Sequence, residues 1–220
     1  MMKELTLEIT NHCVSFCSWC SSSSTAQYDN RTEMSYQKAF KLLDKYANEC
    51  DVVRISGGEP TSHSKLLTIL KHAKELHYRV VLLTNGYGIK KVISSDLVDE
   101  YVVNVVDEHS LEAVDVLKYL GKNVSLHAVL ADGNKKWILA AIRCSFEEEI
   151  PLRLLALQEQ GKARLNTLTC NKPLDLLSWT GDKGCNKDGK ITVTWDGIVA
   201  TCSALKYKDK CNLECVGGAR

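Results

Sequence analysis

The stretch His12-Cys13-Val14-Ser15-Phe16-Cys17-Ser18-Trp19-Cys20 carries three cysteines, with gaps of three and two residues between them. Three thiolates at this spacing can each bind one iron of a 4Fe-4S cubane, and no fourth cysteine lies nearby in the sequence. A cluster held by three protein ligands leaves one iron open, and that iron can bind a small molecule. The stretch therefore predicts a site that does chemistry as well as carrying electrons.

Two other uses of these cysteines fit less well. A structural zinc ion takes four ligands, usually supplied as two pairs, and His12 abuts Cys13 too closely to complete a tetrahedron. A disulfide would leave one thiol over. The chain also has no secretory signal, because Lys3, Glu4 and Glu8 interrupt what would be its apolar core. We therefore expect an iron–sulfur cluster.

The composition is that of an ordinary globular protein, with 220 residues, of which 45% are hydrophobic and 25% are charged. A net charge of +1 gives no electrostatic reason to expect nucleic acid or an acidic membrane as a partner. No stretch approaches the length of a membrane span. Ten cysteines in such a chain suggest metal sites in a reducing compartment, so we expect a cytoplasmic protein.

Outward from the cysteines, strand-like and helix-like segments alternate. Strands are predicted at residues 5–10, 51–56, 79–84, 101–106, 124–130 and 152–157. Helices are predicted at residues 35–48, 64–76 and 134–149, after a Ser110 N-cap to about residue 120, and more weakly at 89–94. This alternation predicts an α/β fold with a parallel sheet and right-handed crossovers.

Polar side chains share one face of several predicted strands. The pairs are Glu8 with Thr10, Arg54 with Ser56, Asn104 with Glu108, and Ser125 with His127. A sheet covered by helices on both faces would instead read as nearly continuous apolar runs. An open doubly wound sheet with individually satisfied core polar groups stays possible. The polar stripe favours an incomplete barrel with a wet, ligand-holding concave side.

The last quarter of the chain differs from the rest, because the helix rhythm stops near residue 163. Residues 186–195 read as a hairpin-type strand region with three apolar residues on one face: Ile191, Val193 and Trp195. We therefore predict two domains, a barrel over residues 1–163 and a small cysteine-rich β-hairpin/helix module over residues 164–220.

Two motifs at strand ends carry a family resemblance. The cysteine loop follows the first strand and has Trp19 before its third cysteine, and Gly57-Gly58-Glu59-Pro60 follows the second strand. With these motifs, residues 1–163 resemble the radical S-adenosylmethionine (SAM) superfamily. The resemblance implies a partial (β/α)6 TIM-like barrel. It also implies a SAM molecule whose amino and carboxylate groups chelate the open iron.

The resemblance implies contacts between SAM and particular residues. Gly57, Gly58 and Glu59 would meet the methionine ammonium, because the glycines allow a close backbone approach and the carboxylate is an acceptor. Ligands of parallel α/β sheets bind at the carboxyl ends of strands. The other cofactor candidates are Trp19, Asn85, Asn104, Ser125 and His127. Two alternatives stay open, namely a turn role for Asn85 and a core role for His127.

The C-terminal cysteines carry a second resemblance, to the SPASM or twitch modules that bind an auxiliary cluster. It rests on the spacing of Gly197 and of four cysteines that would be the ligands: Cys185, Cys202, Cys211 and Cys215. The short segment points to the one-cluster twitch form, so a second 4Fe-4S cluster is implied. Structural zinc is the alternative, and Cys170 could replace one ligand.

The resemblance implies a reaction that begins with one electron from a reductase or flavodoxin-type donor. Cleavage of SAM then gives methionine and a 5′-deoxyadenosyl radical, which abstracts hydrogen from the substrate. Relatives with such modules often modify peptide side chains, so a peptide or protein substrate is the first hypothesis, with a separate peptide-recognition protein as a possible partner. A small metabolite, such as a nucleotide or aminosugar, is the second. A non-catalytic electron carrier or zinc module would not explain Gly57-Gly58-Glu59 or the barrel pattern.

Overall fold

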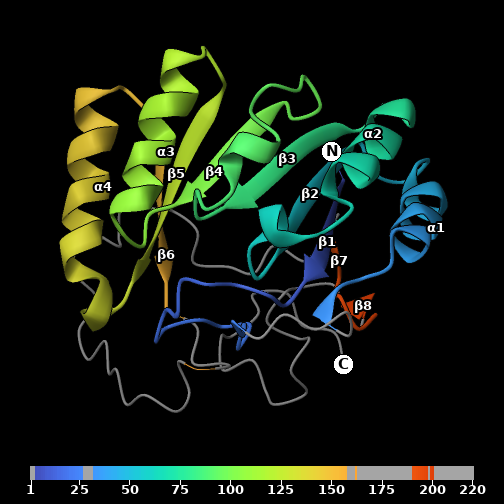
Figure 1. Cartoon of the computed structure of the whole chain (residues 1–220), viewed down its shortest axis with the longest axis horizontal. Coiled ribbons are helices and arrows are strands. Elements are labelled where there is room, and N and C mark those ends of the chain that lie inside the picture. The colour runs from blue at the N-terminus through green and yellow to red at the C-terminus, as the bar shows by residue number, and fades with distance from the viewer. Residues whose placement is uncertain (1–2, 27–31, 158–161, 163–189, 198, 201–220) are drawn as a thin grey trace, which may run out of the picture.

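The computed structural model describes residues 3–26, 32–157, 162, 190–197 and 199–200, and strands and helices alternate in them as predicted (Figure 1). The strands are β1 (Glu4–Thr10), β2 (Val52–Gly57), β3 (Arg79–Thr84), β4 (Glu100–Asn104), β5 (Val124–Leu130), β6 (Leu152–Ala156), β7 (Lys190–Val193) and β8 (Val199–Ala200). The helices are α1 (Tyr36–Tyr46), α2 (Leu66–Glu75), α3 (Glu108–Tyr119) and α4 (Lys135–Glu147), with short 3-10 turns η2 (Pro60–Ser62), η3 (Ile89–Lys91) and η4 (Asp132–Asn134).

The described strands form one sheet in the order β6-β5-β4-β3-β2-β1-β7-β8. Strands β1 to β7 run parallel, and β8 pairs antiparallel with β7. Since parallel strands present their carboxyl ends at the same edge, the loops that follow β1, β2, β3 and β4 gather along one edge of the sheet. That edge carries the cysteine loop.

One face of the sheet is apolar and packs against the helices. Leu5, Leu7 and Ile9 of β1 are fully buried and belong to one hydrophobic core with residues from all four helices. The opposite face carries the polar residues predicted from strand parity. Near the amino ends of the strands, this face also carries a small buried apolar cluster of Val52, Val81 and Val102. The predicted two-faced sheet is confirmed.

Helix α3 begins differently from the prediction. Its N-cap is Asp107, whose side chain accepts a hydrogen bond from the backbone N–H of Ser110. The predicted cap, Ser110, lies inside the helix, and its hydroxyl donates to the carbonyl of Asn85 at 2.9 Å. Glu108, expected on the polar face with Asn104, is instead an exposed residue of the first helical turn. The expected helix at 89–94 is only the single turn η3.

The hairpin-type region joins the main sheet. Strands β7 and β8 pair around a turn that contains Gly197, and β7 also pairs parallel with β1. Ile191, Val193 and Trp195 pack against the main core, as their shared face predicts. The predicted domain boundary at residue 163 stays a prediction. The cysteines of the predicted C-terminal module lie outside the described residues: Cys170, Cys185, Cys202, Cys211 and Cys215. Within the described residues, no helix is long and apolar enough to cross a membrane.

Candidate metal centre

The cysteine loop follows the carboxyl end of β1, and main-chain hydrogen bonds join the two ends of the loop. The N–H of Cys13 donates to the carbonyl of Thr25 at 2.8 Å, and the N–H of Thr25 donates to the carbonyl of Asn11 at 3.0 Å. Farther along, the N–H of Cys20 donates to the carbonyl of Cys17 at 3.2 Å. These bonds fix the loop before any ligand binds, and all three cysteines are partly buried.

The three thiols influence one another electrostatically. Burial, together with smaller contributions from negative charge on Cys13 and Cys20, raises the pKa of Cys17 to about 12. Burial also raises the pKa of Cys13, with smaller contributions from Glu59 and Cys20 and an opposing hydrogen bond with Ser15. Three thiolates this close therefore need a positively charged partner to stay ionised, and iron supplies one.

The donor set fits a cluster better than a single ion. In the part of the chain that the structure describes, no three His, Cys, Asp or Glu side chains group closely enough to hold one metal ion. Ligands of a cubane bind three different irons and stand farther apart than ligands of one tetrahedral zinc. Cys13, Cys17 and Cys20 share one loop and influence one another electrostatically, so they are the residues that would hold the cluster.

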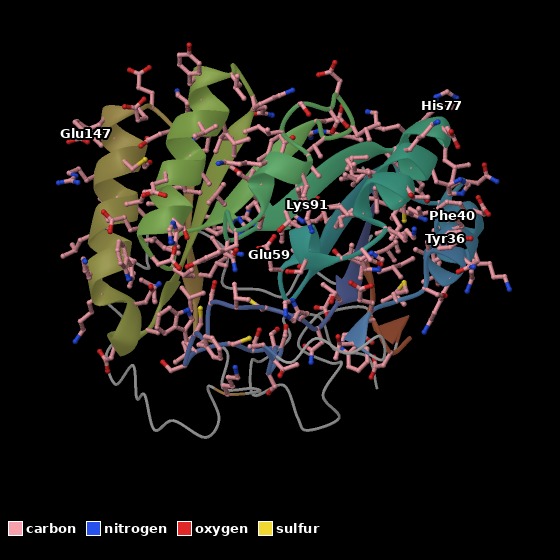
Figure 2. The ribbon with its side chains drawn as sticks, in the orientation of Figure 1. Tyr36, Phe40, Glu59, His77, Lys91 and Glu147 are labelled. Atoms are coloured by element: carbon pink, nitrogen blue, oxygen red, sulfur yellow. The ribbon has the colours of Figure 1, made fainter. Side chains whose placement is uncertain are left out.

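Glu59 is fully buried at the carboxyl end of β2, and both of its oxygens accept hydrogen bonds from the protein (Figure 2). Oε1 accepts from the backbone N–H and the hydroxyl of Thr61, at 3.1 and 2.8 Å, and from the hydroxyl of Thr84 at 2.7 Å. Oε2 accepts from the backbone N–H of Asn85 at 2.7 Å. Burial raises the pKa of this carboxyl, and the hydrogen bonds oppose the rise. In this geometry Glu59 ties β2 to β3, and its predicted contact with an ammonium group stays a prediction.

Gly57 and Gly58 lie too close to the backbone of β1 and of the cysteine loop to carry a side chain. A Cβ on Gly57, whose φ is 142°, would lie 2.3 Å from the carbonyl oxygen of Thr10, and a Cβ on Gly58 would lie 2.3 Å from that of His12. The N–H groups of Gly58 and Glu59 donate to those same two carbonyls, both at 2.7 Å. These glycines therefore allow β2 to lie close to β1 and the cysteine loop, and their predicted close approach to SAM stays a prediction.

Asn85 connects the Glu59 network to the cysteines. Its Nδ2 donates to the hydroxyl of Ser15 at 2.7 Å and lies 3.5 Å from the Sγ of Cys13, while its Oδ1 accepts from the N–H of Tyr87 at 3.0 Å. The side chain is thus directed at a predicted cluster ligand. A direct contact between Asn85 and SAM stays a prediction.

Trp19 lies beside the loop that follows β5. A Cβ on Gly133 would be 3.1 Å from the Trp19 ring, so the ring packs on the backbone of that glycine. The cysteine loop therefore reaches across the carboxyl edge from β1 to β5. This position is compatible with the cofactor role predicted for Trp19, which stays a prediction.

The structure brings together two of the three candidates on β4 and β5. Asn104 and His127 are partners in the strand register, and Arg153 of β6 follows beside His127. Burial, together with the positive charges of Arg54 and Arg153, lowers the pKa of His127 to about 3, so the ring is neutral at pH 7. Ser125 is instead a partner of Val102 in the register, nearer the amino edge.

Ser125 belongs to a separate polar group at that level. Its hydroxyl donates to Glu100 Oε1 at 3.1 Å, and Glu100 also pairs with Arg79 at 2.7 Å. The prediction for Ser125 rested on parity alone, and parity gives the face of a residue but not its depth along the strand.

Several residues of this site were not singled out in the sequence. Thr61, Thr84 and Ser15 hold Glu59 and Asn85 in place, and Gly133 supports Trp19. Thr84 could have been suspected because it ends a strand directly before Asn85. The others belong to loops, whose contacts depend on the tertiary fold.

A family model described as the Radical SAM superfamily matches residues 7–152, more than half of the chain. The chain belongs to the radical SAM superfamily. Members of this superfamily are enzymes, and the domain implies a 4Fe-4S cluster and SAM.

Solved structures of radical SAM proteins share the fold of this radical SAM chain. SuiB from Streptococcus suis, bound to SAM, gives a TM-score of 0.70 at 15% identity, with 96% of this chain and 62% of SuiB covered. BtrN in complex with AdoMet and 2-DOIA gives 0.54 at 16% identity, with 96% of this chain and 76% of BtrN covered. The enzyme anSMEcpe with bound AdoMet gives 0.53 at 14% identity, over 72% of this chain and 50% of that one. At these identities the likeness establishes the fold, a partial TIM-like barrel, and the chain spans less than two thirds of SuiB.

Proposed function

We propose that this chain cleaves SAM reductively and uses the resulting radical to abstract hydrogen from a peptide or protein side chain. The observation that carries the proposal is the three-thiol loop at the carboxyl end of β1, held by the buried network of Glu59 and Asn85. Such a loop presents three ligands to a cluster and leaves the fourth iron for a small molecule.

The protein's own part in this reaction is to hold and orient. Cys13, Cys17 and Cys20 would bind the cluster, which when reduced would supply the electron that cleaves SAM. Gly57, Gly58 and Glu59 fix the loop against β2, so the backbone around them would frame the methionine end of SAM. The other proposed cofactor contacts are Trp19, Asn85, Asn104, Ser125 and His127.

The peptide hypothesis is supported by what similar structures contain. SuiB has been solved bound to its precursor peptide SuiA, with a TM-score of 0.71 to this chain, and anSMEcpe has been solved with AdoMet and a peptide. We propose crosslinking, oxidation or a related modification of a side chain. A reductase or flavodoxin-type donor and a separate peptide-recognition protein would be the partners.

A small metabolite is the second candidate substrate. BtrN, solved with the small molecule 2-DOIA, matches 96% of this chain and has the higher covered share of its own length, 76% against 62% for SuiB. A neutral His127, within reach of the charges of Arg54 and Arg153, offers polar groups that suit a small polar ligand as well as a peptide.

We further propose a twitch-like auxiliary 4Fe-4S cluster on four C-terminal cysteines: Cys185, Cys202, Cys211 and Cys215. Two observations support a C-terminal segment close to the first cluster. The N–H of Lys162 donates to the carbonyl of Cys20 at 3.0 Å, and β7 pairs with β1, the strand that leads into the cysteine loop.

The first experiment measures metal and product on anaerobically purified protein. We expect about eight irons and eight sulfides per chain for two clusters, and 5′-deoxyadenosine when dithionite and SAM are added. A Cys13→Ala, Cys17→Ala, Cys20→Ala variant should keep about four irons and form no product, whereas Cys144→Ala, outside the site, should behave as wild type. Product from the triple variant would refute the proposed reaction, and four irons with zinc in the wild type would refute the auxiliary cluster.

The second experiment separates the substrate classes. A short peptide encoded beside the gene should accelerate 5′-deoxyadenosine formation and lose hydrogen, as measured by mass spectrometry. Acceleration by nucleotides or aminosugars, with no effect of the peptide, would favour the metabolite candidate instead.

A further inference from the structure

Helix α4 has two apolar faces, and one of them points away from the sheet. Ile138 and Ala141 are buried in the core, as expected for a helix that covers a sheet. Leu139, Ile142 and Phe146 are 68%, 39% and 87% exposed. Their spacing of three and four residues aligns them along one side of the helix. A continuous exposed apolar stripe of this kind marks a surface that binds another protein.

Charged residues extend the stripe at both ends. Lys135 lies four residues before Leu139 and so continues the side of α4 formed by Leu139, Ile142 and Phe146, which we call the seam. At the other end of the seam α4 ends at Glu147, and Glu148 and Glu149 follow outside the helix, where Glu149 has a φ of 53°. The Lys135 side chain is 75% exposed and pairs with Asp132 at 2.8 Å. The seam is therefore apolar in the middle, basic at one end and acidic at the other.

These charges are unfavourably placed with respect to the dipole of α4. The first turn of α4 has no acidic residue and the last has no basic one; Lys135 and Lys136 stand at the start, and Glu147, Glu148 and Glu149 follow at the end. A helix dipole favours the opposite arrangement. A second helix that runs antiparallel would bring acidic groups to the basic end and basic groups to the acidic end.

We propose that α4 is a homodimer interface, in which it packs antiparallel against α4 of a second copy of this chain. A two-fold axis at Ile142 brings that residue against Ile142 of the partner subunit. The same axis brings Leu139 near Phe146 of the partner subunit, and it brings the basic N-terminal end of α4 near the acidic C-terminal end of the partner subunit's helix. The apolar side chains and the charges at the two ends are then self-complementary, as a two-fold interface requires. A parallel pair would instead set lysine against lysine and glutamate against glutamate.

The location of α4 permits this contact. The helix lies at one end of the row of helices, with α3 on one side (Figure 1), and Glu147 marks its C-terminal end (Figure 2). A single pair of helices of this length is a small interface, below the ~1,200 Å² of standard stable complexes. We therefore expect a concentration-dependent dimer with a dissociation constant in the roughly micromolar range.

Sedimentation velocity on the anaerobically purified chain, from ~1 to ~200 µM, tests the interface. We expect the wild type to move from monomer to dimer and Ile142→Glu to stay monomeric, a loss of at least ~100-fold in affinity. Leu67→Glu is the matched control, because Leu67 is 45% exposed on α2, and it should dimerise as wild type. A wild type that is monomeric throughout, or a dimer that survives Ile142→Glu, overturns the proposal.

A charge exchange tests the antiparallel register. One variant carries Lys135→Glu and Lys136→Glu, and the other carries Glu147→Lys, Glu148→Lys and Glu149→Lys. Each should be monomeric alone because both ends of its homodimer repel, whereas an equimolar mixture should form a heterodimer at least as tight as the wild-type dimer. Far-UV circular dichroism confirms that both variants are folded. Folded variants that dimerise alone, or that fail to associate when mixed, overturn the register.

Discussion

The β1–β3 half and the β4–β6 half of the carboxyl edge differ in how completely the protein satisfies its own polar groups. In the first half, the Glu59 carboxylate is fully buried and accepts four hydrogen bonds from protein donors. In the second half, Asn104 and His127 are only partly buried on the polar face. The β1–β3 half is therefore held in place by its own hydrogen bonds, whereas the β4–β6 half has partly exposed polar side chains.

The difference suits two kinds of ligand. A cluster needs its three thiolates held at fixed positions, so the loop that carries them is tied by main-chain bonds and by Asn85. An organic ligand is oriented by side chains that keep free hydrogen-bonding capacity. We therefore expect substitutions in the first half to damage fold and cluster together, and substitutions in the second half to leave the fold largely intact.

The largest expected effect comes from Gly58→Ala. The added Cβ would lie 2.3 Å from the carbonyl oxygen of His12, and the next nearest atoms are also backbone, of His12 and Asn11, which leaves little room to relax. We expect a loss of about 3 kcal/mol or more in unfolding free energy and most of the bound iron. Gly121→Ala, where φ is 66° but nothing lies within 4 Å, should cost only about 1 kcal/mol and keep its iron. Equal losses in both variants would contradict the close contact between β2 and the loop.

A second prediction compares the loss of one hydroxyl in each half. Thr84→Val removes a donor to buried Glu59, and we expect a cost of about 1–3 kcal/mol because the carboxylate is left without that partner. Ser125→Ala removes a donor to Glu100, whose side chain is 23% exposed and can bind water instead, so about 0.5 kcal/mol is expected. Chemical unfolding measures both. A larger loss for Ser125→Ala would reverse the comparison.

Much of this contrast could be predicted from the sequence, because it follows from local patterns. Strand parity identified the polar face, and the spacing of Cys13, Cys17 and Cys20 at a strand end identified the loop. What could not be predicted is which partner each polar group finds. The role of Glu59 depends on Thr84, which is 25 residues away and is brought near by strand order.

This dependence of hydrogen-bond partners on the tertiary fold also explains where the sequence-based predictions differ from the structure. Ser110 has the residue type of an N-cap, but Asp107 is three residues earlier and reaches the N–H of Ser110, so the helix begins at Glu108. Parity placed Ser125 and His127 on one face, as the structure does, but it could not show that Ser125 lies two residues nearer the amino edge and donates to Glu100. Propensity and parity are local, whereas hydrogen-bond partners are set by the tertiary fold.

A third prediction concerns pH and the second half of the site. His127 has a folded-state pKa of about 3 against 6.5 for the unfolded chain, so the unfolded state binds the extra proton between these values. Stability is therefore full above pH 6.5 and falls as pH drops towards 3. His127→Gln should remove this slope, a difference of about 1 kcal/mol between pH 7 and pH 5.5.

Thermal unfolding at those two pH values measures the slope, as a change of about 2–4 °C. His109→Gln is the matched control, because that ring is 58% exposed and Glu112 raises its pKa rather than lowering it. The slope should persist in the control. An unchanged slope in His127→Gln would mean that this ring is solvated rather than buried.

The smallest expected effect tests whether the rigid half also tunes the cluster. The Asn85 Nδ2 lies 3.5 Å from the Cys13 sulfur, and an N–H group beside a cluster thiolate stabilises the reduced state, which carries more negative charge. Asn85→Leu should therefore lower the midpoint potential by roughly tens of millivolts, as measured by redox titration with electron paramagnetic resonance in the absence of SAM. Asn104→Leu, the same substitution in the other half, should leave the potential unchanged. If both variants shift it equally, the two halves do not differ in their influence on the cluster, and the rigid network serves only to hold the loop.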